Sequence, residues 1–93
     1  MPSTLPRPKP TVVFREMPEG AILFCTATEI YFSLNSVGVQ VWRLLHPVCS
    51  TESEVVSSLA KLHPEVNSVA IAEDVNQLIR DLLENALVEA PAA

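Results

Sequence analysis

Residues 29–42, EIYFSLNSVGVQVW, constrain the fold more than any other part of the sequence. The first half of this stretch alternates polar and apolar residues, a pattern typical of a strand with one buried face. From Asn35 onward the apolar residues recur at helical spacing instead. Asn favours the N-cap because its side-chain oxygen accepts a hydrogen bond from a free amide at the helix start. The sequence therefore predicts a strand that passes into a helix without a linker.

The chain has 93 residues, which is the size of one domain. No apolar run reaches the ~18 residues of a membrane span, and the N-terminal sequence MPSTLPRPKP lacks the apolar centre of a signal peptide. We therefore expect a cytoplasmic protein. Residues 1–10 hold four of the eight prolines and are predicted to form a flexible or extended arm that does not contribute to the core. Residues 11–88 are predicted to form the domain, and residues 89–93 a short tail.

Two further strands are predicted before the strand at residues 29–34. Residues 11–16 and 21–25 are rich in β-branched and apolar residues, and the sequence MPEG between them favours a turn. Because residues 21–25 are apolar on both sides, we expect this strand in the centre of the sheet, covered on both faces. In the third strand, Phe32 and its alternate neighbours are expected to face inward and Tyr31 outward.

Two further helices are predicted after the helix that Asn35 caps. Pro47 ends that first helix, and Thr51 and Glu54 have the spacing of a capping box at the start of the second. The third and longest helix is predicted over residues 68–84, with Asn85 as a left-handed C-cap. Short helices must pack against a sheet to bury their apolar stripes. The predicted fold is α+β and winged helix-turn-helix-like, a three-stranded antiparallel sheet followed by three helices.

The sequence argues against an enzyme. With only two glycines, the chain has no phosphate-binding loop and no dinucleotide-binding motif. Cys25 and Cys49 lack the spacing of a zinc site; we expect free, buried thiols, with Cys49 the better candidate for a reactive one because it precedes a helix. His46 and His63 lie far apart beside prolines and are expected to be ordinary helix-end residues. We expect no catalytic residue, no metal site and no cofactor.

The charge balance disfavours nucleic acid as a partner. The chain has 11 acidic and 6 basic residues, whereas binding to a phosphate backbone depends on Lys and Arg. A winged helix that binds DNA would place residues 68–84 in the major groove. In this segment Arg80 is the single basic residue against four acidic ones, so DNA would be repelled. Such an acidic helix face is usually solvated.

Three runs of the sequence resemble a known family. They are AILFCTATEIYFSLNSVGVQVWRLL, then TESEVVSSLAKLHPEV, then DVNQLIRDLLENALV. Together they resemble the PqqD-like proteins, also called RiPP recognition elements, which bind the precursor peptides of ribosomally made natural products. The resemblance covers residues 12–88 and is most specific in YFSLNSVGVQVW. It departs from the family at Cys25 and Thr26, where an acid is expected, and in a hairpin without glycine.

The resemblance implies that the leader part of a precursor peptide binds as an added strand, along the third strand and beside the third helix. Strand addition requires an exposed sheet edge, and the third strand is a candidate edge. The expected main-chain contacts are Glu29, Ile30, Tyr31, Phe32, Ser33 and Leu34. On the facing helix, helical spacing gives the candidates Asp74, Val75, Leu78, Asp81 and Leu82. For the apolar residues of this set, the sequence leaves two alternatives: they line the groove, or they pack in the core. For the two aspartates it also leaves two: they bind basic residues of the leader, or they are solvated.

The expected function is therefore that of a non-catalytic adaptor that presents a leader peptide to a modifying enzyme. In this family the enzyme is a radical enzyme in the pyrroloquinoline quinone route, or a leader protease in lasso-peptide routes. The alternatives are a winged-helix DNA-binding module and a dimerisation module that pairs its own edge strands. We expect a monomer, or a weak or strand-swapped dimer, and no partner in the membrane.

Overall fold

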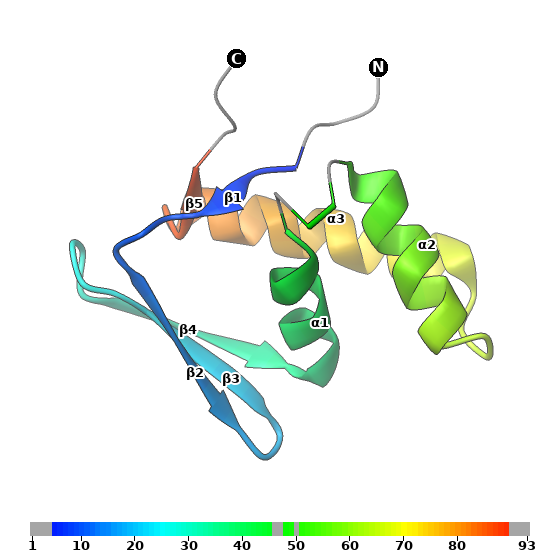
Figure 1. Cartoon of the computed structure of the whole chain (residues 1–93), viewed down its shortest axis with the longest axis horizontal. Coiled ribbons are helices and arrows are strands. Elements are labelled where there is room, and N and C mark those ends of the chain that lie inside the picture. Colours follow the sequence, from blue (N-terminus) through cyan, green and yellow to red (C-terminus); the bar gives the residue numbers. More distant parts are fainter. Residues whose placement is uncertain (1–4, 46–47, 50, 90–93) are drawn as a thin grey trace.

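The strand-to-helix switch is the centre of the fold. In the computed structural model, which describes residues 5–45, 48–49 and 51–89, a three-stranded sheet precedes three helices (Figure 1). The antiparallel sheet has the order β2-β3-β4. Its strands are β2 (Val12–Met17), β3 (Gly20–Cys25) and β4 (Ile30–Asn35). The helices are α1 (Ser36–Leu44), α2 (Glu52–Leu62) and α3 (Ser68–Glu84). The predicted α+β fold is confirmed, while the predicted helix stop at Pro47 lies outside the described residues.

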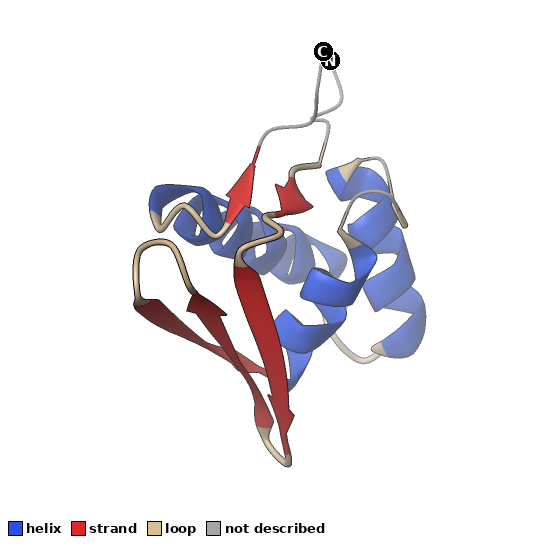
Figure 2. Cartoon of the chain, turned by 60° about the vertical axis from the view of Figure 1, so that its left-hand side comes forward, coloured by secondary structure: helices blue, strands red, loops and turns tan. Residues whose placement is uncertain are grey.

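The helices lie on one side of the sheet, and the core fills the space between the two layers (Figure 2). The largest fully buried side chains come from both layers and from both ends of the described chain: Leu5, Leu23, Cys25, Val41, Leu45, Val55, Leu59, Val75, Leu82 and Leu87. Apolar burial of this kind is the main favourable term in folding. Within the described ranges, no helix combines the length and the apolar content needed to cross a membrane.

The face of the sheet away from the helices is only partly covered. Ile22 and Phe24 of the central strand are half-buried there, so the prediction that this strand is covered on both faces is wrong. Phe24 packs instead against Tyr31 of the neighbouring strand, with ring centroids 4.6 Å apart. An apolar residue in a strand can thus be shielded by a cross-strand partner rather than by a second layer.

Asn35 is both the last residue of β4 and the N-cap of α1. Its side-chain Oδ1 accepts a hydrogen bond of 2.8 Å from the backbone N–H of Gly38, as predicted. The second predicted cap is also present, because Oγ1 of Thr51 accepts a hydrogen bond from the backbone N–H of Glu54 at 3.3 Å. Side-chain capping satisfies amides that have no partner within the helix.

Both glycines of the chain lie against Leu34, which is 5% exposed. A Cβ atom on Gly20 would lie 1.9 Å from the carbonyl oxygen of Leu34. A Cβ atom on Gly38 would lie 3.1 Å from Cδ2 of the same leucine. Glycine at these two positions therefore lets the neighbouring strand and the following helix approach Leu34 closely.

Two turns differ from the prediction. Glu29 has a φ of 61°, and its N–H donates to the carbonyl of Cys25 at 2.7 Å, so Glu29 closes the hairpin and the strand begins at Ile30. The predicted strand at residues 29–34 is thus displaced by one residue. At the end of α3, Asn85 has a φ of −88°, so the predicted left-handed conformation at this residue is wrong. The left-handed residue is the next one, Ala86, with a φ of 56°.

The two ends of the described chain pair with each other. β1 (Arg7–Pro8) runs antiparallel to β5 (Val88–Glu89), and Arg7 Nε lies 3.1 Å from Glu89 Oε1. Leu5 is 0% exposed and belongs to the core. The segment is thus extended rather than flexible at Arg7–Pro8, and the prediction that it does not contribute to the core is wrong for Leu5. Glu89 is part of a strand rather than of a tail. The prolines in this segment favour an extended backbone, which suits strand pairing at an edge.

We expect Gly20→Ala to lower the free energy of unfolding by at least about 2 kcal/mol, because its methyl group would meet a backbone carbonyl at a φ of +155°. Gly38→Ala is the matched control. Its methyl group meets a side chain, and alanine gains about 1 kcal/mol over glycine within a helix, so a net change below ~1 kcal/mol is expected. Urea denaturation measures the free energy of unfolding of both variants. An equal loss of stability in the two would contradict the conclusion that Gly20 has less room for a side chain than Gly38.

Leu5→Ala is expected to lower the free energy of unfolding by about 2–4 kcal/mol, because it removes a fully buried side chain. Val13→Ala, on the exposed face of the sheet, is the control and should change stability by less than ~1 kcal/mol. Chemical denaturation followed by circular dichroism compares the two. An unchanged stability of Leu5→Ala would mean that this segment does not dock onto the core in solution.

Candidate functional site

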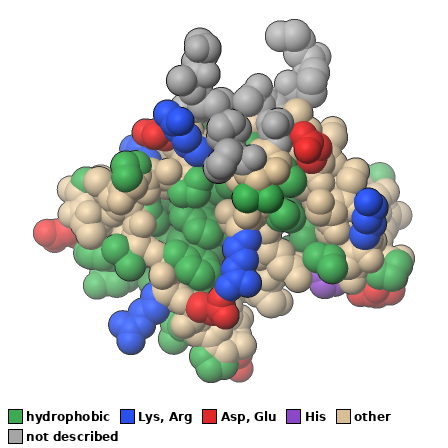
Figure 3. Space-filling view, viewed as in Figure 1, with side chains coloured by type: hydrophobic (Ala, Val, Ile, Leu, Met, Phe, Trp, Pro, Cys, Tyr) green, Lys and Arg blue, Asp and Glu red, His purple; other side chains and the backbone are tan. Residues whose placement is uncertain are grey.

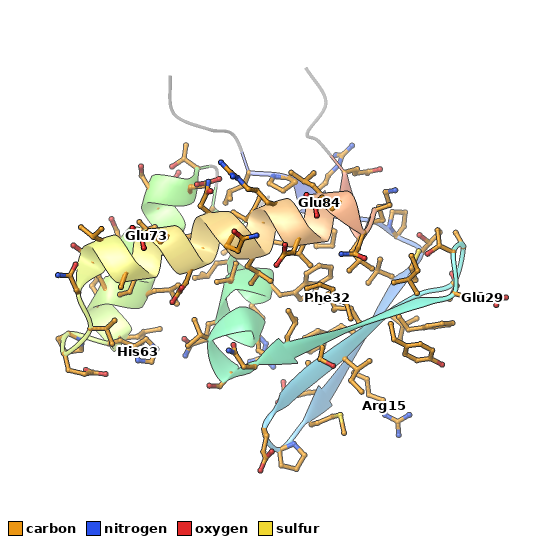
Figure 4. The ribbon with its side chains drawn as sticks, turned by 180° about the vertical axis from the view of Figure 1, so that it is seen from behind. Arg15, Glu29, Phe32, His63, Glu73 and Glu84 are labelled. Atoms are coloured by element: carbon orange, nitrogen blue, oxygen red, sulfur yellow. The ribbon has the colours of Figure 1, made fainter. Side chains whose placement is uncertain are left out.

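A groove of about 370 Å³ lies between β4 and α3. Figure 4 shows it from the side on which α3 lies in front, with Phe32 between the strand and the helix. The lining residues come from the end of β4, the start of α1 and the middle of α3: Phe32, Ser33, Leu34, Asn35, Val37, Gly38, Val41, Asp74, Val75, Gln77, Leu78 and Asp81. The lining combines apolar side chains from all three elements with polar ones, among them two carboxylates, both from α3.

The wall formed by β4 is an edge strand. In the order β2-β3-β4, β4 has a partner on one side only within the described sheet. Exposed edges are usually protected by charged residues, prolines or bulges. The six residues of β4, IYFSLN, contain neither a charge nor a proline. This edge is therefore unprotected and available for pairing with another extended chain.

The register shows which main-chain groups point to the open side. The N–H of Thr26 donates to the carbonyl of Thr11 at 2.9 Å, which makes these two residues a hydrogen-bonded pair at the end of β2 and β3. Hydrogen bonding alternates residue by residue along an antiparallel strand. Leu23 therefore bonds toward β4, where its partner is Phe32. We infer that the backbone groups of Tyr31 and Ser33, between the residues that bond to β3, face the open edge.

The structure brings seven of the eleven predicted site residues together in the groove: Phe32, Ser33, Leu34, Asp74, Val75, Leu78 and Asp81. The other four lie elsewhere. Glu29 is in the hairpin turn, Ile30 and Tyr31 are at the start of β4, and Leu82 is 0% exposed in the core. Val75 is also almost fully buried, so only its edge reaches the groove, whereas Leu78 is half-buried.

The first two turns of α1 add a part of the groove that the sequence-based prediction missed. Val37 and Val41 line the end of the groove next to β4, together with the cap residue Asn35. Because α1 starts directly after β4, its first turn must lie beside the end of the edge strand. The absence of a linker in the sequence was the signal that could have indicated these residues.

The charge of the groove is negative. None of the twelve lining residues is Lys, Arg or His, and the two charged ones are Asp74 and Asp81. Asp81 Oδ1 accepts a hydrogen bond of 3.0 Å from the neutral side chain of Gln77. Asp74 has no hydrogen bond or ion pair with the residues that the structure describes. Neither carboxylate therefore forms an ion pair with a cation of the described residues.

The cysteines lie outside the groove. Cys25 and Cys49 are both free and buried, as predicted. Hydrogen bonds from Thr28 lower the pKa of Cys25 to about 7, whereas burial raises the pKa of Cys49, which is the reverse of the order predicted for their reactivity. In the described part of the chain, no three His, Cys, Asp or Glu residues are placed to hold a metal ion. His46 lies outside the described residues.

The fold and the groove define a small α+β domain with an unprotected strand beside a helix. The sequence pattern of the family described as Coenzyme PQQ synthesis protein D (PqqD) matches residues 20–88. The chain therefore belongs to the PqqD family, and the family predicted from the sequence is confirmed.

One solved structure shares the fold across almost the whole chain. It is that of TbiB1 in complex with the TbiA(beta) leader peptide, with a TM-score of 0.79. The match covers 94% of this chain and 99% of TbiB1 at 24% sequence identity. The comparison with curated protein sequences finds no match.

Two leucines on α3 differ in burial, which assigns Leu82 to the core and Leu78 to the groove. Leu82→Ala is expected to lower the free energy of unfolding by about 2–5 kcal/mol, because Leu82 is fully buried. Leu78→Ala removes a half-buried side chain from the groove wall, and a loss of about 1 kcal/mol is expected. Urea denaturation of the two variants tests this. A loss at Leu78 as large as that at Leu82 would assign Leu78 to the core.

Proposed function

We propose that this protein is a non-catalytic adaptor that binds the leader segment of a ribosomally made precursor peptide and presents it to a modifying enzyme. The observation that carries the proposal is the unprotected edge of β4 beside a groove with both apolar and acidic side chains. A leader segment in extended conformation continues the sheet as a further strand. Its backbone pairs with Tyr31 and Ser33, and alternate side chains enter the groove.

In this proposal the apolar wall supplies contact area and the strand edge supplies hydrogen bonds. Phe32 and Leu78 lie on opposite sides of the groove, so an apolar leader side chain between them loses its contact with water. Main-chain pairing alone is insensitive to sequence, because every residue except proline carries the same backbone groups. Selectivity for one leader must therefore come from the side chains along the groove.

Two comparisons support the proposal. The chain belongs to a family named for its part in coenzyme PQQ synthesis. TbiB1, which shares the fold, binds a leader peptide. A peptide held along one strand edge leaves the rest of the precursor free, which is what presentation to a second protein requires. The enzyme that receives it is, by resemblance, a radical enzyme or a leader protease.

Amide NMR of the labelled protein tests the binding site directly. Adding the leader segment of a short precursor encoded next to its gene is expected to shift signals in residues 30–35 and 74–81. These residues form the open edge and the facing helix. Shifts confined to other surfaces would contradict the proposal. Edge-strand shifts that depend on protein concentration without peptide would indicate pairing between two copies, and shifts on α3 with duplex DNA would indicate a nucleic-acid-binding module.

The variants Ser33→Pro and Ser33→Ala test the mode of binding in the same experiment. Proline removes the backbone N–H that we infer to face the open edge, and it is tolerated in edge strands when that N–H faces solvent. Alanine keeps the N–H and removes only the hydroxyl. We expect Ser33→Pro to weaken leader binding at least about tenfold and Ser33→Ala to leave it within about twofold. Methylation of alternate backbone nitrogens in the leader is the reciprocal test and leaves the protein unchanged.

A further inference from the structure

The charge of the groove has a defined pattern along α3. Asp74, Leu78 and Asp81 all line the groove and follow each other at steps of four and three residues. Residues at this spacing lie on one face of a helix, one above the other. The two carboxylates are thus separated by two helical turns, about 10.5 Å along the axis. Leu78 lies between them, so the helix presents an apolar side chain flanked by two negative charges.

Among the described residues, neither Asp74 nor Asp81 forms an ion pair. No Lys, Arg or His lines the groove, and the ion pairs of the described residues are Arg7–Glu89, Arg43–Glu16 and His63–Glu65. Lys and Arg side chains are visible on the opposite face of the molecule (Figure 3). Asp81 is partly buried beside the groove, whereas Asp74 is exposed. Salt therefore screens interactions with Asp81 less than those with Asp74.

We propose that the groove selects leader segments in which an apolar residue is flanked on both sides by Lys or Arg. This inference rests on the proposed function, because it concerns the same groove and the same added strand. It goes further by naming the chemistry of the peptide. Acidic segments are disfavoured at this edge by repulsion from Asp74 and Asp81.

The geometry of an extended peptide sets the spacing of the basic residues. Side chains on one face of a strand recur every second residue, about 6.8 Å apart. An apolar residue that faces Leu78 therefore has its same-face neighbours two positions before and two positions after it, about 13.6 Å from each other. Lys and Arg side chains are long and flexible enough to reach inward to carboxylates about 10.5 Å apart. The selected pattern is thus basic, any, apolar, any, basic.

A library of short random peptides displayed on phage and selected on the full protein tests the inference without assuming a leader. Selected peptides are expected to carry the basic–apolar–basic pattern and to shift the amide signals of residues 30–35. Replacing both basic residues of such a peptide by Gln is expected to weaken its binding about tenfold at low salt. This difference should shrink as the salt concentration rises.

Two double variants of α3 test whether Asp74 and Asp81 cause the preference for basic peptides. Asp74→Asn with Asp81→Asn removes both charges of the groove and keeps the shape of both side chains. Glu73→Gln with Glu84→Gln is the matched control, because these acids lie on the side of α3 that faces away from the sheet (Figure 4). We expect the first double variant to bind the basic peptide and its Gln form with equal affinity. The control should retain the difference.

Each outcome of the selection has one meaning. Peptides that bind the edge of β4 without basic residues would overturn the charge pattern and leave the adaptor function standing. A selection that yields no peptide at this edge would overturn both. A preference for basic peptides that survives in the Asp74→Asn, Asp81→Asn variant, or that disappears equally in the control, would show that the two groove carboxylates do not cause it.

Discussion

Leu34 is held between the two glycines of the chain, and the geometry of the groove depends on this contact. On one side, Gly20 lets the backbone of β3 approach the carbonyl of Leu34, which fixes how the edge strand pairs with the sheet. On the other side, Gly38 lets the first turn of α1 pack against the leucine side chain. These two close approaches therefore help to set the position of the edge strand relative to the helices.

Local patterns in the sequence were sufficient for the main elements of the fold. The change of period at Asn35 and the capping spacing at Thr51 act over three or four residues, so they are visible without tertiary structure. No local sequence pattern indicates the pairing of β1 with β5. Each strand has two residues, and the partners lie at opposite ends of the described chain. Leu5 is a single apolar residue among prolines, and only tertiary packing shows that it is buried.

The candidate groove could be predicted in part. An edge strand without charge and a facing amphipathic helix are properties of the sequence, and both are present. The division of the apolar stripe of α3 into core and groove was not predictable, because helical spacing places Val75, Leu78 and Leu82 on one broad face. Which of them is covered depends on how the helix lies across the sheet. The hairpin was displaced for a similar reason: Glu29 adopts a left-handed conformation that its residue type does not favour.

The direct passage of β4 into α1 also determines where the chain tolerates a change of length. One residue inserted at Asn35 would rotate α1 by about 100° relative to the sheet, because each residue advances a helix by that angle. An insertion within β4 would exchange its inner and outer faces. The hairpin at residues 26–29 carries no such coupling, since its residues are exposed and extra ones only lengthen a loop. Insertions and deletions among proteins of this architecture should therefore collect in that hairpin and be absent from the junction between strand and helix.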